Sequence, residues 1–327
     1  MLSFAPIILF AYNRPKHTEQ TLIALKNNVL ASESILYIFI DGAKKDSDAE
    51  NIEKNRKVSE IAKSQKWCKE VYIIEREKNF GLAENVINGV TDIVNKHGKI
   101  IVLEDDLITS PHFLEYCNEG LEMYKNHSNI YSINAYQFDL NTDKTDTFLC
   151  PLATSSWGWA TWADRWNIFD RNPSQKKIIQ NNIHIRKRFN LSDYDYATML
   201  DNQKSWAIRW YYSVFIRNGL GLFPTKSLVS NIGFDGSGEN CGTLNINQNI
   251  YQKKIKLSEK TEVNAELYAQ LLEYFTLKNN SIPSESSSYN FSSLIKKTVK
   301  ILCPPIILNL FIEIRLIIKK ITQKTRV

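Results

Sequence analysis

Short apolar runs alternate with longer polar stretches through the first hundred residues of the chain. Four runs are continuously apolar, which is typical of strands buried on both faces of a sheet. These runs cover residues 5–11, 35–40, 71–74 and 100–103. Between them, apolar positions recur with helical spacing at 16–28, 48–66 and 81–95. This order predicts an α/β protein with a mainly parallel sheet and helices on both faces.

Polar residues follow three of the predicted strands directly. In such sheets, ligands bind beyond the carboxyl ends of the strands, so we expect these residues to converge on one crevice. They are Asn13 and Arg14 after the first strand, Asp41 and Gly42 after the second, and Glu104, Asp105 and Asp106 after the fourth.

The three adjacent carboxylates Glu104, Asp105 and Asp106 repel one another, and burying them uncompensated would be costly. A hard cation resolves this conflict, because Mg²⁺ or Mn²⁺ takes oxygen ligands and commonly combines one or two carboxylates with substrate phosphates. Such an ion would stabilise a diphosphate leaving group. The alternative is a solvated acidic turn.

Three smaller motifs each allow two interpretations. Arg14, in Asn13-Arg14-Pro15, could face a phosphate or could belong to a loop that starts a helix. Asp41-Gly42 could bind a base or ribose, or form a simple turn. The segment from Asn79 to Gly81 could present helix N-terminal amides to a ligand or act as a cap. No dinucleotide-binding or P-loop glycine fingerprint accompanies them.

Six of the seven tryptophans lie within residues 157–210. Aromatic rings stack on sugars but also dominate protein cores. We expect Trp157 and Trp159 to be nearest to an acceptor role and the others to lie in the core. The histidines have no metal-ligand spacing, and His17 and His112 are expected at the surface.

The net charge is +6, but its distribution is uneven. From Phe291 onward, eight Lys and Arg residues accompany the single acidic residue Glu313, so the remainder of the chain is nearly neutral. A near-neutral body gives no electrostatic basis for nucleic-acid binding. The five scattered cysteines form no CxxC pair, which argues against a disulfide scaffold and fits a reducing cytoplasm. The first apolar run is interpreted as a strand and not as a signal peptide.

The C-terminal part differs in composition from the rest. Residues 281–293 are serine-rich and predict a linker, and residues 294–327 form a basic amphipathic tail, interrupted by Pro304 and Pro305. Apolar runs flanked by lysine favour a helix lying on anionic lipid, which would place the chain at the inner face of the cytoplasmic membrane. Packing on the rest of the chain or on a partner subunit is the alternative.

Residues 102–116 (VLEDDLITSPHFLEY) resemble the GT-A glycosyltransferases, and especially the N-acetylglucosaminyltransferase I group. The similarity continues at Gly158-Trp159, at Trp166, and at residues 224–242, which resemble a segment leading into a donor-covering loop. The Asp41-Gly42 and Asn79-Phe80-Gly81 features resemble bacterial family-2-like sugar transferases.

The resemblance implies a role for each acidic residue. Asp106 would bind the metal, Glu104 and Asp105 would contact the donor's ribose and sugar, and Asp41 would hold the base. It also implies an inverting reaction in which a carboxylate deprotonates the acceptor. The family places this base just before a tryptophan, where this chain has Lys204-Ser205-Trp206. The candidates for the base are therefore Asp201 and Asp235.

The resulting expectation is a GT-A domain over residues 1–280, with a nucleotide-binding half at 1–109 and an acceptor half at 110–280. It would transfer a sugar from a nucleotide-sugar donor, a UDP-sugar by preference, to a saccharide or lipid-linked acceptor. A role in making bacterial lipopolysaccharide or capsule fits the tail. The alternatives are a sugar nucleotidyltransferase and a saccharide-binding protein that has lost its catalytic base.

Overall fold

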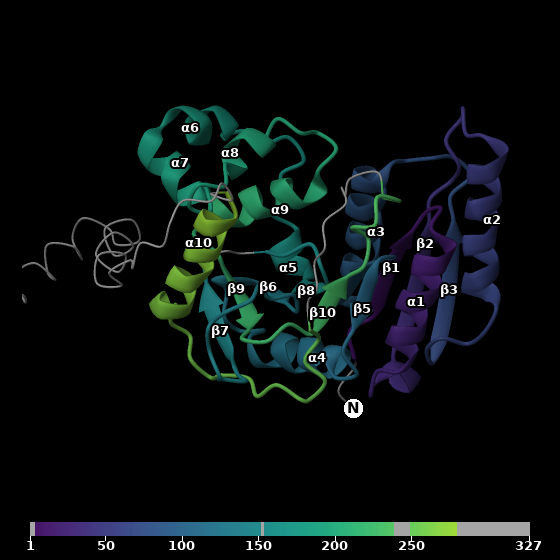
Figure 1. Cartoon of the computed structure of the whole chain (residues 1–327), viewed down its shortest axis with the longest axis horizontal. Coiled ribbons are helices and arrows are strands. Elements are labelled where there is room, and N and C mark those ends of the chain that lie inside the picture. Colours follow the sequence, from purple (N-terminus) through teal and green to yellow (C-terminus); the bar gives the residue numbers. More distant parts are fainter. Residues whose placement is uncertain (1–3, 152–153, 239–248, 280–327) are drawn as a thin grey trace, which may run out of the picture.

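The computed structural model describes residues 4–151, 154–238 and 249–279, and its main feature is one large mixed sheet. The predicted linker and tail, at 281–327, lie outside the described residues, as do residues 239–248 of the predicted covering loop. The sheet has eight strands in the order β3-β2-β1-β4-β8-β6-β9-β7, and a separate pair joins β10 to β5 (Figure 1).

The four predicted strands are all present and are parallel neighbours in the sheet. They are β1 (Ile7–Ala11), β2 (Ile35–Ile40), β3 (Glu70–Glu75) and β4 (Lys99–Glu104). The second half of the chain adds β6 (Ile130–Asn134), β7 (Thr147–Cys150), β8 (Trp159–Trp162) and β9 (Leu220–Pro224). Because β8 runs antiparallel to β4 and β6, and β7 antiparallel to β9, the sheet is mixed.

The helices between the first strands also agree with the sequence pattern. They are α1 (Pro15–Lys26), α2 (Ala49–Lys63) and α3 (Leu82–His97), and a short 3-10 helix η1 (Ala31–Glu33) precedes β2. Later in the chain come α4 (Phe113–Met123), α5 (Ala163–Trp166), α6 (Lys176–Asn181), α7 (Ile183–Phe189), α8 (Tyr196–Met199), α9 (Trp206–Phe215) and α10 (Ala265–Asn279). Within the described residues, none of these helices is both long and apolar enough to cross a membrane.

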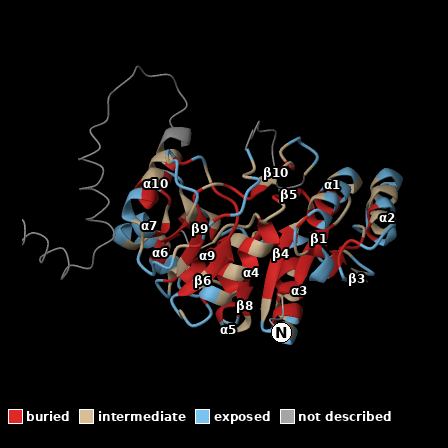
Figure 2. Cartoon of the chain, turned by 90° about the horizontal axis from the view of Figure 1, so that it is seen from below, coloured by how far each residue is buried: buried red, intermediate tan, exposed pale blue. Residues whose placement is uncertain are grey.

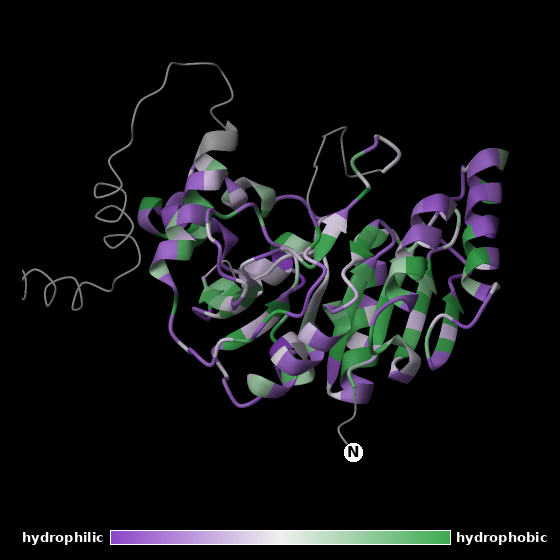
Figure 3. Cartoon of the chain, turned by 60° about the horizontal axis from the view of Figure 1, so that its bottom comes forward, coloured by the Kyte–Doolittle hydropathy of each residue, from purple (hydrophilic) through white to green (hydrophobic). Residues whose placement is uncertain are grey.

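The sheet is covered on both faces at β1 and β2, which explains why these two strands are apolar at every position, whereas the edge strand β3 is partly exposed. Successive side chains of a strand point to opposite faces. On β1, Ile7 and Leu9 therefore pack with α1, α2 and α4, whereas Ile8 and Phe10 pack with α3, α5 and α9. Figure 2 shows the strands as a buried layer between helices, and Figure 3 shows the apolar strands inside more polar helices.

A third core lies in the second half of the chain. There, Phe148 of β7 and Phe223 of β9 pack against buried residues of α6 to α10, including Phe189 and Leu271. These helices form a lobe beside the end of the sheet (Figure 1).

The strand pair β5–β10 brings a distant part of the chain to the end of β4. The short strand β5 (Leu107–Thr109) follows the acidic triplet, and it pairs antiparallel with β10 (Val229–Asn231). The pairing continues one step further, because the Ile232 amide donates to the Asp106 carbonyl oxygen at 2.9 Å. The loop after β10 therefore lies directly against the triplet.

Candidate active site

A pocket opens at the carboxyl ends of β1, β2 and β4, and it collects the residues predicted to bind a donor and a metal. It is lined by Asn13, Arg14, Asp41, Asn79, Gly81, Glu104, Asp105 and Asp106. Of the residues expected to converge on one crevice, all but Gly42 line this pocket, while their individual roles stay predictions. The lining residues without a predicted role are Phe10, Ala11, Tyr12, Lys44, Leu82, Asn85, Ser237 and Gly238.

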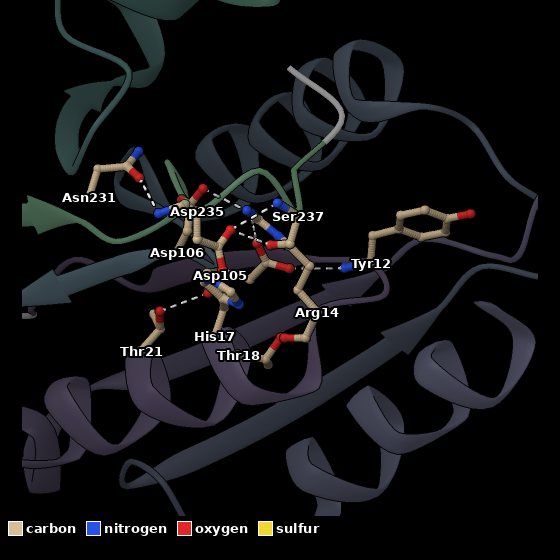
Figure 4. Close-up of polar contacts among 11 residues, drawn as sticks. Tyr12, Arg14, His17, Thr18, Thr21, Asp105, Asp106, Asn231, Asp235 and Ser237 are labelled. Atoms are coloured by element: carbon tan, nitrogen blue, oxygen red, sulfur yellow. Dashed lines mark hydrogen bonds and ion pairs between the residues drawn. The ribbon is translucent and has the colours of Figure 1, made fainter. Parts of the chain in front are cut away.

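Arg14 joins the two aspartates of the triplet. It stands between β1 and α1, and its Nη2 contacts Asp105 Oδ1 and lies 2.8 Å from Asp106 Oδ2 (Figure 4). The Thr21 hydroxyl of α1 holds the Asp105 carbonyl at 2.9 Å. Two buried atoms of this cluster, Arg14 Nη1 and Asp106 Oδ1, have no hydrogen-bond partner among the described residues. The cluster is therefore held in place by these contacts, but two of its polar atoms still lack a hydrogen-bond partner.

The electrostatics of the cluster reflect an excess of negative charge. Burial raises the pKa of Glu104 to about 8, with Asp106 and Asp105 adding to the shift and with Arg14 and a hydrogen bond from Trp206 opposing it. Burial also raises the pKa of Asp105, against the pull of Arg14. Burial alone would lower the pKa of Arg14, but the charges of Asp105 and Asp106 outweigh burial and raise this pKa overall. Three carboxylates thus face one guanidinium, which favours a further cation.

Asp41 fastens the end of β2 to the loop that precedes α3. Its buried carboxylate accepts hydrogen bonds from the amides of Gly42, Phe80 and Gly81 at 3.0, 2.8 and 2.9 Å. The Asn79 amide donates to the Gly42 carbonyl at 2.8 Å. Gly81 has φ +76°, a conformation that glycine adopts without strain, and it caps α3. Asp41 therefore has a loop-holding role, and its predicted contact with a base stays a prediction.

Asp235 lies on the loop after β10, close to the triplet (Figure 4). His17 of α1 approaches its Oδ2 with Nε2 at 3.2 Å, and the amide and hydroxyl of Ser237 bind its Oδ1 at 2.9 and 2.6 Å. The bonds from Ser237, and then the charge of His17, lower the pKa of Asp235. The surface position expected for His17 is thus corrected, because the ring is half-buried against Asp235. His112, also expected at the surface, pairs with Glu115 and is half-buried as well.

The structure does not bring Asp201, the other candidate base, to the pocket. Its carboxylate is largely exposed and pairs with Lys176 Nζ at 3.1 Å and with the Gln180 amide at 3.0 Å. The tryptophan that follows it in sequence, Trp206, does reach the site through its bond to Glu104. Ser205, just before this tryptophan, caps α9 by accepting from the Ile208 amide at 3.3 Å. A capping serine thus stands at the position where the resemblance to the N-acetylglucosaminyltransferase I group would place the base.

The two tryptophans predicted near the acceptor have different environments. Trp159 is fully buried, and its ring stacks on Trp206 at 5.4 Å between centroids and lies 5.7 Å from Trp166. Its predicted acceptor contact is therefore corrected to a core role. Trp157 is half-buried and packs edge-on against Phe234, next to Asp235, at 5.5 Å. Its acceptor role stays a prediction.

Some pocket residues could have been inferred, and others could not. Tyr12 adjoins Asn13, and Ser237 belongs to the segment 224–242 that the resemblance singled out, so both had a signal in the sequence. For the hydrogen bond between Trp206 and Glu104, the only signal in the sequence was the tryptophan expected from the resemblance. For the His17–Asp235 pair, the sequence contains no signal. Both depend on packing between distant segments.

The donor set of the pocket fits a divalent cation held mainly by substrate. Among residues 4–151, 154–238 and 249–279, no group of three or more His, Cys, Asp or Glu side chains is arranged to hold a metal. Mg²⁺ does not require one, because it is often bound by one or two carboxylates together with substrate phosphates and water. The unpartnered and buried Asp106 Oδ1 provides one such hard oxygen.

The mixed sheet and the acidic pocket at its carboxyl edge define an α/β protein of the GT-A fold. Residues 7–191, more than half of the chain, match the family model described as glycosyl transferase family 2. The chain belongs to this family, and it is a glycosyltransferase by fold. No curated protein sequence matches it.

Solved structures resemble the chain only distantly. A mannosyltransferase from Pyrobaculum calidifontis in complex with GDP-Man and Mn²⁺ has 9% identity and a TM-score of 0.35, over 50% of this chain and 46% of that one. S. aureus TarS 1–349 has 12% identity and a TM-score of 0.35, over 69% of this chain and 59% of that one. A UDP-glucose pyrophosphorylase complexed with UDP-glucose has 10% identity and a TM-score of 0.28, over 51% of this chain and 79% of that one. The chain thus spans about half of the first two structures, and likeness at this level says nothing about activity.

Proposed function

We propose that this chain transfers a sugar, with inversion, from a nucleoside-diphosphate sugar to a saccharide acceptor, with Mn²⁺ or Mg²⁺ as cofactor. The observation that supports this most directly is the buried, unpartnered Asp106 Oδ1 in a pocket at the carboxyl edge of the sheet. Family membership supports glycosyl transfer in general. The metal, the donor and the stereochemistry are our proposals.

In this proposal, Asp106 Oδ1 is the protein's ligand to the cation, and phosphate oxygens and water complete the shell. When bound, the cation would stabilise the negative charge that develops on the leaving diphosphate. Arg14 contributes a second, permanent positive charge at the same place, and its free Nη1 can bind a phosphate oxygen. Gly81 and Leu82, where α3 begins, also line the pocket, and a helix N-terminus favours an anionic ligand.

We propose Asp235 as the base that activates the acceptor. Hydrogen bonds from Ser237 and the charge of His17 lower the pKa of this carboxylate, and the same two residues hold it beside the pocket. The carboxylate takes the proton of the acceptor hydroxyl, whose oxygen bonds to the anomeric carbon as the bond from that carbon to the diphosphate breaks. The nucleoside diphosphate leaves, and the configuration at the anomeric carbon is inverted.

The cellular role that we propose is synthesis of a bacterial surface glycan, such as lipopolysaccharide or capsule, at the inner face of the cytoplasmic membrane. The support is the basic amphipathic sequence at 294–327, which would bring the chain to a lipid-linked acceptor. UDP-sugars are the first donors to screen, followed by other nucleotide sugars.

The decisive experiment measures nucleoside diphosphate released from candidate donors during a Mn²⁺ titration. Asp106→Asn removes the anionic ligand but keeps the side-chain shape, so we expect at least a hundredfold loss of metal-dependent turnover with unchanged circular dichroism. Asp201→Asn, at an exposed surface ion pair, is the matched control and should retain activity. Undiminished turnover of Asp106→Asn would refute the metal site.

A saccharide-binding protein without transferase activity is the second candidate, because Ser205 caps α9 at the position where the resemblance to the N-acetylglucosaminyltransferase I group would place the base. The same assay distinguishes the possibilities. A transferase releases nucleoside diphosphate, a sugar nucleotidyltransferase exchanges pyrophosphate, and a binding protein does neither while still binding saccharide.

A further inference from the structure

The helices α6 and α7 form a basic corner far from the sheet edge at β3 (Figure 1). The stretch 176–189 reads KKIIQNNIHIRKRF, with five Lys and Arg residues and no acidic residue. This cluster of charge is unlike the rest of residues 1–290, which contain 28 basic and 34 acidic residues. We call residues 176–189 the α6–α7 corner.

Two isoleucines project from this corner into solvent. The side chains of Ile178 and Ile183 are 54% and 62% exposed, the highest fractions among the large hydrophobic residues that the structure describes as exposed. The corner is nevertheless well anchored, because Ile179 and Phe189 are buried in the third core. The exposed isoleucines therefore belong to a folded surface and do not result from a loosely packed helix end.

Part of the positive charge at this corner is not neutralised. Lys176 pairs with Asp201, and Arg186 contacts Asp195. In contrast, Lys177 and Lys187 are exposed and have no ion-pair partner within the part of the chain that the structure describes. The turn after α7 adds one exposed acidic residue, Asp193. The surface thus combines apolar tips with an excess of cations.

We propose that the α6–α7 corner docks the chain on an anionic lipid bilayer. Exposed aliphatic side chains flanked by lysine and arginine match a membrane interface, where apolar groups enter the acyl boundary and cations contact lipid headgroups. An acidic protein partner would satisfy the lysines but would not by itself explain two isoleucines exposed among them. The combination of exposed isoleucines and unpaired lysines therefore favours a lipid surface over an acidic protein.

The α6–α7 corner and the pocket lie on the same side of the molecule (Figure 1). In Figure 1, α6, α7 and α8 lie on the side toward which the parallel strands run, which is also the side of the loop after β10. A bilayer touching the corner would therefore lie on the pocket's side of the molecule. This use of the corner rests on the proposed function, since it would bring the pocket to a lipid-linked acceptor.

The test is co-sedimentation of the full chain with vesicles of phosphatidylcholine containing phosphatidylglycerol, and with vesicles of phosphatidylcholine alone. We expect binding to the anionic vesicles and at least a fivefold weaker association for the double variant Ile178→Ser with Ile183→Ser. The matched control, Ile23→Ser with Ile52→Ser, changes isoleucines of 46% and 52% exposure on α1 and α2, and it should bind as the wild type does.

A second pair of variants tests the charges. One Lys near an anionic surface contributes on the order of 1 kcal/mol, so Lys177→Gln with Lys187→Gln should weaken binding roughly 25-fold. Lys66→Gln with Lys69→Gln removes two exposed lysines between α2 and β3, on the side of the molecule away from the α6–α7 corner (Figure 1), and should have a much smaller effect.

All these variants retain the C-terminal tail, so any contribution from the tail is equal in each. If wild-type chain fails to bind anionic vesicles, or if the corner variants bind as tightly as their controls, the proposal is wrong. Release of nucleoside diphosphate from a soluble donor should be unchanged in every variant. Failure of docking and failure of the proposed function are thereby separate outcomes.

Discussion

At the residue scale, the pocket is dominated by Arg14 and the two aspartates that share it. The guanidinium neutralises part of the charge on Asp105 and Asp106 and leaves Asp106 Oδ1 free. Gly233 allows this arrangement, because a Cβ there would lie 2.2 Å from Asp106 Oδ2 and 2.9 Å from Arg14 Nη1. The cluster therefore depends on a glycine from the loop after β10 as well as on the strand ends.

Replacing Arg14 should reveal the affinity of the aspartates for a cation. Arg14→Gln leaves two buried carboxylates without their partner, which we expect to lower the free energy of unfolding by about 3–5 kcal/mol. Mn²⁺ should restore part of that loss, so the metal should raise the melting temperature of the variant more than that of the wild type. Thermal melts with and without Mn²⁺ measure this difference. Equal shifts in the two proteins would contradict the assignment of the metal to this cluster.

Asp235 is the residue on which the chemical step depends in our proposal. Asp235→Asn should lower kcat by roughly 10²–10⁴-fold, because general-base catalysis contributes about that much, with donor affinity nearly unchanged. Steady-state kinetics and donor titration separate these quantities. If the variant turns over at the wild-type rate, a group other than Asp235 accepts the proton of the acceptor hydroxyl. His17→Gln should show a smaller loss of kcat, since the glutamine can still donate to the carboxylate.

At the element scale, the connection between β2 and α3 shapes the donor side of the pocket. Asp41 binds three backbone amides across this connection, and Gly42 lies against the backbone of Lys78. A Cβ on Gly42 would lie 2.6 Å from the Lys78 carbonyl carbon. Because the obstacle is backbone and not a flexible side chain, it cannot move away without displacing the loop.

Gly42→Ala should therefore destabilise the protein and disturb donor binding together. We expect a loss of about 1–3 kcal/mol in the free energy of unfolding, the usual effect of forcing an extra group into a packed site. Urea denaturation measures the loss, and donor titration tests the pocket. An unchanged urea midpoint would show that the β2–α3 connection is looser than the structure implies.

At the scale of the whole molecule, the pocket is assembled from β1, β2, β4, the start of α3 and the loop after β10. Segments this far apart in sequence come together only in the folded chain, so a ligand that bridges them should stabilise the fold globally. Binding at 100 times Kd adds about 2.7 kcal/mol of stability.

Nucleoside diphosphate and Mn²⁺ together should therefore raise the melting temperature by about 5–10 °C, as expected for a domain of this size. Differential scanning calorimetry compares the nucleotide with Mn²⁺ and the nucleotide with a chelator. We expect a much smaller shift with the chelator, and the same small shift for Asp106→Asn under both conditions. Equal shifts of the wild type with and without chelator would argue against metal-mediated binding.

The sequence alone determined the first half of the fold and the location of the pocket. Continuous apolar runs can be buried only in a covered sheet, and parallel strands bring their carboxyl ends to one edge, so Asp41, Arg14 and the triplet had to converge. The boundaries of β1 to β4 agree with the pattern to within two residues at each end.

Tertiary structure decided which of the other candidates reach the pocket. Trp159 and Trp157 are alike in sequence context, yet only packing against Trp206 and Trp166 buries the first. Asp201 is directed to solvent by Lys176, whereas the β5–β10 pairing carries Asp235 to His17 and the triplet. These outcomes depend on contacts between segments far apart in the chain. Local patterns of apolar and polar residues do not determine such contacts, because each pattern reflects only its own element.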